Sequence, residues 1–319
     1  MTKIVFLDHA TIGPGVEIRT PAFAHDWITH DRTAEADLLT RLAGAQIAIT
    51  NKVPLRGDTL RQLPDLKFIA VAATGYDVID IDACRELGIG VANIRGYAVN
   101  TVPEHTFALI TALRRNIVEY RDQTLDGAWV RADQFCFFNR PIRDIAGSTL
   151  GIIGAGAIGQ AVGRVGRGFG MEVIYHDAFA ASAPDTGPLV ELTELRDRAD
   201  VVTCHCPLTD DTRNMIDAAF LDGMKPTAIV INTARGGIID EAALAQAIRT
   251  KSIAGAGIDV VMQEPPALDS EIMELARAPN VILTPHVAWA SVGGMQTLVD
   301  QLIDNIEAFV RGQSQNRIV

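Results

Sequence analysis

The feature that most constrains this chain is a glycine-rich turn between an apolar run and a helical segment. The run Leu150–Ile153 leads directly into Gly154-Ala-Gly-Ala-Ile-Gly159, and a second apolar run, Glu172–His176, ends at Asp177. A glycine pattern alone is weak evidence, but strand, turn, helix, strand and acid in this order are typical of a βαβ unit that binds a dinucleotide. The region therefore predicts a dinucleotide-binding fold.

Each residue of this turn has a physical task in such a unit. Gly154 permits the tight turn, Gly156 lets the backbone approach a pyrophosphate, and Gly159 allows the helix to pack closely on the strand. The N–H groups and dipole of the following helix attract the phosphates. Asp177 can accept hydrogen bonds from the ribose hydroxyls and would repel a 2′-phosphate, and residues 178–181 contain no arginine. We therefore expect NAD(H) rather than NADP(H) as the cofactor.

Short apolar runs alternate with helical patterns along the whole chain. The predicted strands are Lys3–Asp8, Ala45–Thr50, Leu66–Ala72, Gly88–Asn93, Thr149–Ile153, Glu172–His176, Asp200–Cys206, Ala228–Thr233, Gly255–Val260 and Val281–Thr284. Such alternation predicts an α/β fold with parallel sheets that helices cover on both faces. The length of 319 residues suggests about two domains.

The helical patterns have recognisable ends. They occupy Thr33–Leu42, Thr101–Leu125, Glu241–Arg249 and Met295–Arg311. Asp240 is a good N-cap, Pro103 lies near a helix start where its missing N–H costs little, and Gly312 would end the last helix. The sequence leaves open whether that helix covers the second domain or returns to the first.

The composition argues against two classes of partner. The chain has 28 Lys and Arg residues against 39 Asp and Glu, a formal net charge of −11. Nucleic-acid phosphates need a basic surface, and no basic amphipathic segment typical of membrane-surface proteins is present. No apolar run reaches the ~18 residues of a membrane span, and charges come too early for a secretory signal. We therefore expect a cytoplasmic protein that binds neither nucleic acid nor membrane.

The chain has four cysteines, at positions 84, 136, 204 and 206, too few for a disulfide scaffold of this size. Strand alternation places Cys204 and Cys206 on the same face. Core thiols are the favoured interpretation, and a metal or redox pair is the alternative.

The segment Asp126–Gly147 has no clear period and carries Trp129, Phe135, Phe137 and Phe138. If these aromatic side chains are exposed, they mark a partner surface. If they are buried, they form a small satellite core. The composition favours a contact between copies of the chain and leaves the satellite core open.

Three polar residues, Arg235, Glu264 and His286, each follow one of the last three predicted strands. Nucleotide sites in such folds open at the carboxyl ends of the strands. An arginine can hold a carboxylate with two hydrogen bonds, a histidine can donate a proton to a carbonyl oxygen, and a glutamate bonded to that histidine favours the imidazolium. Each residue alone also admits a structural role, but together they predict hydride transfer to a 2-keto acid.

Two other histidines are weaker candidates for the proton donor. His105 lies near the start of a predicted helix, where capping or packing is the better interpretation, and His205 would point away from Cys204 and Cys206 on its strand. No group of His, Cys and Asp residues has the spacing of metal ligands. We therefore expect hydride transfer without a metal.

These motifs together resemble those of the D-isomer-specific 2-hydroxyacid dehydrogenases, over essentially the whole chain. The matching motifs are Gly154–Gly159, Cys206-Pro-Leu-Thr209 with Thr212, Asn232-Thr-Ala-Arg-Gly-Gly237, Gly257-Ile-Asp-Val260 with Glu264-Pro265, and Thr284-Pro-His286. The resemblance implies that Arg235, Glu264 and His286 form the catalytic set. A member of this family without catalysis, an NAD-sensing binding module, is the alternative from another functional class.

The resemblance also implies an architecture. It predicts two Rossmann-like domains with doubly wound parallel sheets and the active site in the cleft between them. The substrate-binding domain would comprise residues 1–99 and 290–319, and the NAD-binding domain residues 100–289. Family members are usually homodimers through the NAD-binding domains, and Trp129–Phe138 is expected to be part of that interface.

The ligand contacts follow from the motifs and the resemblance. The expected cofactor contacts are Thr74, Gly154, Gly156, Ala157, Ile158, Gly159, Asp177, Cys206, Pro207, Thr212, Thr233, Ala234, Asp259 and His286. The expected substrate contacts are Asn51, Lys52, Thr74, Gly75, Arg235 and Trp289. Asn51 and Lys52 offer hydrogen-bond donors, and Trp289 would narrow the pocket, which suits a small polar substrate.

Within the family, the resemblance is greatest to the branch that reduces hydroxypyruvate to D-glycerate, and often glyoxylate to glycolate. It is carried by Asn51-Lys-Val53, Ala73-Thr-Gly-Tyr-Asp77, Asn93-Ile-Arg-Gly-Tyr97 and His286-Val-Ala-Trp-Ala-Ser291. The same chemistry on a lactate-type, 3-phosphoglycerate-type or branched-chain substrate remains an alternative.

Overall fold

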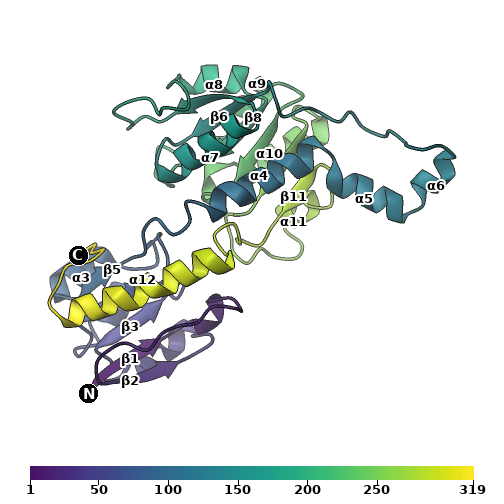
Figure 1. Cartoon of the computed structure of the whole chain (residues 1–319). Helices are drawn as coiled ribbons and strands as arrows, with labels where there is room; N and C mark the ends of the chain where they lie inside the picture. The colour runs from purple at the N-terminus through teal and green to yellow at the C-terminus, as the bar shows by residue number, and fades with distance from the viewer. The chain divides into compact units, whose positions relative to one another are not determined.

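Two parallel sheets organise the chain, one in each of two units. The structure, a computed structural model, describes residues 1–319 (Figure 1). The first unit comprises Met1–Ala98 and Ala290–Val319, and the second comprises Val99–Trp289. The predicted fold class, α/β with parallel sheets, is confirmed. No helix is both long and apolar enough to cross a bilayer.

The sheet of the first unit has five strands in the order β2-β1-β3-β4-β5, all parallel. The strands are β1 (Thr2–Phe6), β2 (His25–Thr29), β3 (Ile47–Thr50), β4 (Phe68–Val71) and β5 (Gly90–Ala92). The helices are α1 (Leu38–Leu42), α2 (Gly57–Leu60), α3 (Ile81–Leu87) and α12 (Val292–Val310), with short 3-10 turns at His9–Thr11 and Glu35–Asp37. The buried strands β3, β4 and β5 lack polar alternation because helices cover them.

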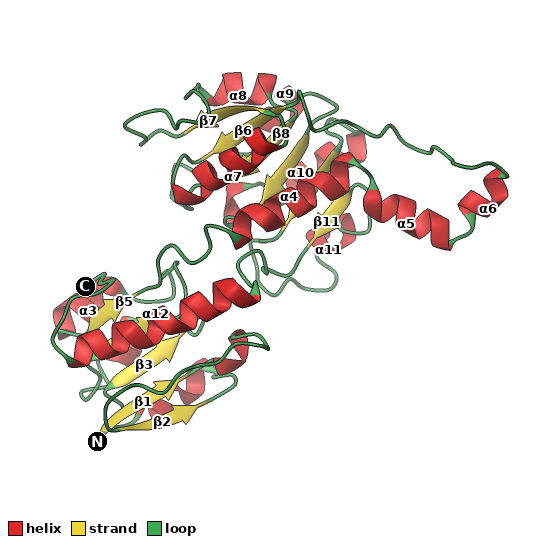
Figure 2. Ribbon diagram, viewed as in Figure 1, coloured by secondary structure: helices red, strands yellow, loops and turns green.

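The sheet of the second unit has six parallel strands in the order β11-β10-β9-β8-β6-β7. They are β6 (Thr149–Ile153), β7 (Glu172–His176), β8 (Val201–Cys204), β9 (Ile229–Asn232), β10 (Gly255–Ile258) and β11 (Val281–Leu283). The helices are α4 (Thr101–Arg114), α5 (Ile117–Leu125), α6 (Ala128–Ala132), α7 (Ala157–Gly168), α8 (Leu192–Arg198), α9 (Ala218–Gly223), α10 (Glu241–Thr250) and α11 (Glu271–Leu275), with a 3-10 turn at Gly236–Ile238. In Figure 2 helices flank this sheet, with α4 and α7 packed against each other.

The C-terminal helix α12 returns to the first unit, which settles the question that the sequence left open. It packs against β4, where the rings of Phe68 and Phe309 stack 4.3 Å apart. Ser291 caps its start by accepting the Gly294 N–H, and Gly312, with a φ of 70°, follows its end as predicted.

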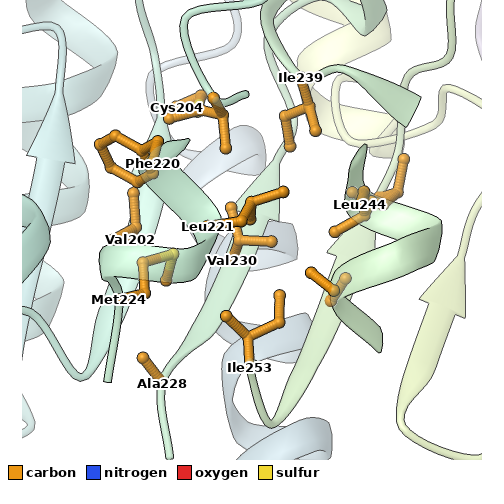
Figure 3. Packing of buried hydrophobic residues seen from close by; sticks show 14 of the residues in the cluster. Val202, Cys204, Phe220, Leu221, Met224, Ala228, Val230, Ile239, Leu244 and Ile253 are labelled. Atoms are coloured by element: carbon orange, nitrogen blue, oxygen red, sulfur yellow. The ribbon is translucent and has the colours of Figure 1, made fainter. Parts of the chain in front are cut away.

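The largest buried cluster of the second unit lies between its sheet and helices α9 and α10 (Figure 3). Cys204 is fully buried there near Phe220 and Ile239, and burial raises the pKa of its thiol well above the ordinary value. Cys204 is therefore a core thiol, as favoured. No group of three or more His, Cys, Asp or Glu side chains is placed to hold a metal ion.

The structure differs from the predicted elements in three places. Strand β2 was not predicted, because it is an edge strand with a polar, partly exposed sequence and no apolar run. The helix expected over Thr101–Leu125 breaks into α4 and α5 at Asn116, whose φ of 53° is incompatible with a continuous helix. The helix expected over Thr33–Leu42 is reduced to a 3-10 turn and α1.

Candidate active site

The glycine-rich turn joins the end of β6 to the start of α7. Gly154 has a φ of 104°, and a Cβ there would come within 2.6 Å of the His205 backbone. A Cβ on Gly159 would lie 1.9 Å from the Gly154 carbonyl oxygen, so α7 packs tightly on the turn. A Cβ on Gly156 would meet no protein atom within 4 Å. The glycine at 156 is therefore not required by packing within the chain, which fits the expected approach of a pyrophosphate.

Asp177 holds this turn from the end of the neighbouring strand β7. Its Oδ2 accepts a hydrogen bond from the Ala155 N–H at 2.7 Å, and its Oδ1 accepts one from the Phe179 N–H at 2.9 Å. The residue is half-buried, and each carboxylate oxygen has two lone pairs. The carboxylate can therefore fix the turn and still accept hydrogen bonds from ribose hydroxyls.

The remaining cofactor candidates lie around the same carboxyl edge of the sheet. Ala157 is exposed and Ile158 half-buried, both in the first turn of α7. Burial raises the pKa of the Cys206 thiol to about 11, so this thiol stays protonated at neutral pH. Thr212 is buried, and its hydroxyl donates to the Pro207 carbonyl at 2.7 Å. Thr212 therefore shapes the turn, and a contact with the cofactor remains a prediction.

The loop that carries Arg235 begins at the end of β9. Asn232 fixes it on both sides, because its Nδ2 donates to the Arg235 carbonyl at 2.8 Å and its Oδ1 accepts the Ala234 N–H at 3.0 Å. A Cβ on Gly236 would lie 2.0 Å from the Val261 carbonyl carbon. The arginine loop and the loop after β10 are therefore in direct backbone contact, which only glycine permits.

Glu264 and His286 come together as the sequence predicted. His286 Nδ1 lies 2.7 Å from Glu264 Oε2, while Glu264 Oε1 accepts the Val261 N–H at 3.1 Å. The two side chains are 25% and 34% exposed, so a ligand can reach the pair. With Nδ1 bound to the glutamate, Nε2 is the ring nitrogen that can present a proton to a ligand. Trp289 lies beside the pair, since its indole N–H donates to the His286 carbonyl at 2.9 Å.

Asp259 anchors the loop around His286. Its Oδ1 accepts the Thr284 hydroxyl at 2.6 Å and the Val287 N–H at 3.0 Å, and its Oδ2 accepts the Ala288 N–H at 2.9 Å. The Asp259 side chain is fully buried, and His286 has a φ of 55°, which few residues with a Cβ adopt. The sequence predicted Asp259 only as a cofactor contact, and it missed this anchoring role because two of the three partners, Val287 and Ala288, bind through main-chain N–H groups.

The two rival histidines have structural surroundings. His105 Nε2 lies 3.0 Å from the Thr284 hydroxyl, so α4 supports the histidine loop. His205 Nε2 lies 2.9 Å from the Thr203 hydroxyl, and burial lowers the pKa of His205 to about 3. At neutral pH the His205 ring is uncharged and holds no spare proton to transfer as an imidazolium.

The candidates in the first unit follow strands β3 and β4. Asn51 is buried and Lys52 exposed, and the carboxylate of Asp8 accepts the backbone N–H of both, at 2.9 and 2.6 Å. Thr74 is exposed, and its hydroxyl donates to a backbone carbonyl just beyond β5 at 2.9 Å. Gly75 follows it and is half-buried. No role was predicted for Asp8, since a single aspartate at the end of a strand is not a signal in the sequence.

Residues 107–288 match the family model described as "D-isomer specific 2-hydroxyacid dehydrogenase, NAD binding domain". The chain is also 53% identical over 315 residues to the glycerate dehydrogenase of Methylorubrum extorquens, with 98% of each chain covered. This chain belongs to the D-isomer-specific 2-hydroxyacid dehydrogenases. It is an NAD-dependent enzyme of that family.

Two more distant relatives also match this chain over almost its whole length. The hydroxypyruvate reductase of Blautia hydrogenotrophica is 33% identical, with 98% of each chain covered. The structure of D-lactate dehydrogenase from Aquifex aeolicus, complexed with NAD and lactic acid, is 28% identical and superposes with a TM-score of 0.80, covering 97% of this chain and 96% of that one. The D-2-hydroxyacid dehydrogenase fold thus extends over both units of this chain.

Proposed function

We propose that this dehydrogenase reduces hydroxypyruvate to D-glycerate with NADH, and glyoxylate to glycolate by the same chemistry. The observation that carries the proposal is the Glu264–His286 pair at 2.7 Å, together with the backbone contact between the Arg235 loop and the loop that carries Glu264. The full-length similarity to a glycerate dehydrogenase and a hydroxypyruvate reductase supports the choice of substrate.

The three catalytic residues have distinct roles in this proposal. Arg235 binds the substrate carboxylate and polarises the keto group, since a guanidinium offers paired donors to a carboxylate. NADH, when bound, supplies the hydride to the keto carbon. His286 donates the proton on Nε2 to the keto oxygen, which becomes the hydroxyl oxygen of the product. Glu264 holds the ring by Nδ1, so that Nε2 is the nitrogen left to face the keto oxygen.

The cofactor is held by the carboxyl edge of the second sheet. The turn Gly154–Gly159 and the start of α7 bind the pyrophosphate, and Asp177 accepts hydrogen bonds from the adenosine ribose. The other proposed contacts are Thr74, Ala157, Ile158, Cys206, Pro207, Thr212, Thr233, Ala234, Asp259 and His286. Asn51, Lys52, Thr74, Gly75, Arg235 and Trp289 are the proposed substrate contacts.

The homodimer is also part of the proposal. Helices α5 and α6 extend from the sheet of the second unit, with Leu125, Val130, Phe135 and Phe138 between 72% and 90% exposed (Figure 1). Phe137 packs on Tyr120, but this contact does not bury its neighbours. Such an apolar surface supports a contact between two copies rather than a satellite core. A monomeric mass in sedimentation equilibrium would contradict it.

We place the enzyme in the cytoplasm. All four cysteines are free thiols, which suits a reducing compartment.

The experiment that tests the function is a panel of NADH oxidation rates. Purified enzyme is mixed with NADH and millimolar hydroxypyruvate, glyoxylate or pyruvate, and hydroxypyruvate is repeated with NADPH. We expect the highest kcat/KM for hydroxypyruvate with NADH, and chiral analysis should identify D-glycerate. A higher kcat/KM for pyruvate would move the assignment to a lactate-type substrate, and no turnover of any keto acid would favour the NAD-sensing module.

A further inference from the structure

The first unit has a buried carboxylate at the point where the order of its strands reverses. In the sheet order β2-β1-β3-β4-β5, strands β1 and β3 are neighbours, as Figure 2 shows. The chain continues from β1 to β2 on one side of this pair and from β3 to β4 on the other side. In open α/β sheets, ligands bind outside the carboxyl ends of the strands at this kind of position. Asp8 follows β1 there and is 4% exposed. It belongs to the lining of a cavity of about 340 Å³ that also includes Lys52.

The Asp8 carboxylate binds three successive backbone N–H groups of the turn after β3. Asn51 N–H donates to Oδ1 at 2.9 Å, and Lys52 N–H and Val53 N–H donate to Oδ2 at 2.6 and 3.3 Å. Successive N–H groups that converge on one anion form a nest. Here the anion is a side chain of the protein itself, 43 residues earlier in the sequence than Asn51.

The nest explains how this charge is tolerated inside the unit. Burial raises the pKa of the Asp8 carboxyl, and the N–H groups of Lys52, Asn51 and Val53 counteract that rise. The N–H groups depend equally on the carboxylate, since a buried donor without an acceptor is costly. Asp8 and the turn therefore fix each other.

A second contact closes the turn from inside. The hydroxyl of Thr50, which is fully buried, donates to the Val53 carbonyl at 2.9 Å. The N–H groups of the turn are bound by Asp8 and the Val53 carbonyl by Thr50, so the turn is held from both sides. These contacts fix the backbone from which the Asn51 and Lys52 side chains extend.

We infer that Asp8 is a positioning residue that sets the affinity for the 2-keto acid by fixing the Asn51–Val53 turn. The inference rests on the proposed function, because it takes Asn51 and Lys52 as substrate contacts. Asp8 itself does not touch the substrate in this account, and its carboxylate oxygens are occupied by the turn. Its effect should therefore appear in KM for the keto acid rather than in cofactor binding or kcat.

The test is Asp8→Asn in the full-length enzyme, with steady-state kinetics and NADH titration by fluorescence. The amide keeps one acceptor and replaces the other by a donor that faces N–H groups. We expect KM for hydroxypyruvate to rise about tenfold, in line with the loss of a buried hydrogen bond. kcat and the Kd for NADH should stay within about twofold, because the three proposed catalytic residues and every proposed cofactor contact except Thr74 lie in the second unit.

The matched control is Asp31→Asn. Asp31 lines the same cavity, its side chain is 86% exposed, and the substitution removes the same charge without touching the turn. We expect its KM to stay within about twofold of wild type. An equal rise in both variants would indicate a general charge effect and overturn the positioning role.

A merely structural role predicts a different result for Asp8→Asn. The fraction of active enzyme and the Tm would then fall while KM of the folded enzyme stayed unchanged, and this outcome would overturn the inference. If Asp8→Asn does not fold, Thr50→Val is the second variant, because it removes the hydrogen bond from the Thr50 hydroxyl to the Val53 carbonyl. It should raise KM for the keto acid about threefold with unchanged NADH affinity. An unchanged KM in Thr50→Val would count equally against the inference.

The two proposals fail in different ways. Wild-type enzyme that does not reduce hydroxypyruvate contradicts the proposed function, and the Asp8 comparison is then made with the keto acid of highest kcat/KM. If no keto acid is reduced, the result contradicts both the proposed substrate contacts and the role of Asp8. Active wild-type enzyme with an unchanged KM in Asp8→Asn contradicts only the role of Asp8.

Discussion

At the carboxyl edge of each sheet an aspartate stabilises a neighbouring turn, and the two aspartates differ in burial. At each edge an aspartate at the end of one strand binds the backbone of the turn after the adjacent strand. Asp8 is buried, and its carboxylate accepts hydrogen bonds from the N–H groups of three residues of its turn. Asp177 is half-buried, and its carboxylate accepts one hydrogen bond from its turn, from the Ala155 N–H. The Asp8 carboxylate therefore only fixes its turn, whereas the Asp177 carboxylate can also accept hydrogen bonds from a ligand. Burial, rather than residue type, therefore distinguishes the proposed positioning acid from the proposed cofactor-binding acid.

Turnover should depend most strongly on His286, at the carboxyl edge of the sheet in the second unit. His286→Ala removes the proposed proton donor, and general acid catalysis contributes about 10²–10⁴-fold. We expect kcat to fall by that factor while NADH affinity, measured by fluorescence titration, changes less than about twofold. Retention of more than about a tenth of wild-type kcat would show that another group supplies the proton.

Two glycine substitutions separate packing from ligand binding within one turn. Gly159→Ala places a Cβ 1.9 Å from the Gly154 carbonyl oxygen, and such overpacking costs about 1–3 kcal/mol or more. We expect the Tm to fall by several degrees in a thermal melt. Gly156→Ala meets no protein atom, so it should leave the Tm unchanged and weaken NADH binding about tenfold. Equal effects of the two substitutions on Tm would contradict the assigned roles.

A smaller effect compares the two acids directly. Asp177→Asn removes the charge that repels a 2′-phosphate, so KM for NADH should rise a few-fold and KM for NADPH should fall. Steady-state kinetics with both cofactors at saturating hydroxypyruvate measure this ratio. Asp8→Asn should leave the NADH to NADPH preference unchanged. A shift of cofactor preference in Asp8→Asn would break the distinction between the two edges.

The sequence predicted best what depends on neighbouring residues. The glycine turn, the Asp240 cap of α10 and the buried strands each have a local signal, and the Asp240 side chain does accept the N–H groups of Ala242 and Ala243. The Glu264–His286 contact could be proposed because both residues follow strands of one sheet, whose carboxyl ends meet at one edge.

What the sequence missed depends on contacts between distant residues or on single backbone angles. The break at Asn116 is one φ angle in an otherwise periodic helix. Strand β2 exists because β1 offers it a partner, since its own residues are half polar. Asp8 and Asp259 bind main-chain N–H groups, which every residue except proline possesses, so no side-chain pattern marks their partners.

The nest at Asp8 has a practical consequence for redesign of the enzyme. The contacts that shape the Asn51–Val53 turn come from Asp8 and Thr50, and they act on main-chain atoms. Position 52, whose side chain is exposed, should therefore accept a library of side chains without a change in the backbone of the turn, provided that proline is left out because it lacks the N–H. Substrate preference could then be changed at this position while the backbone that carries it stays as it is.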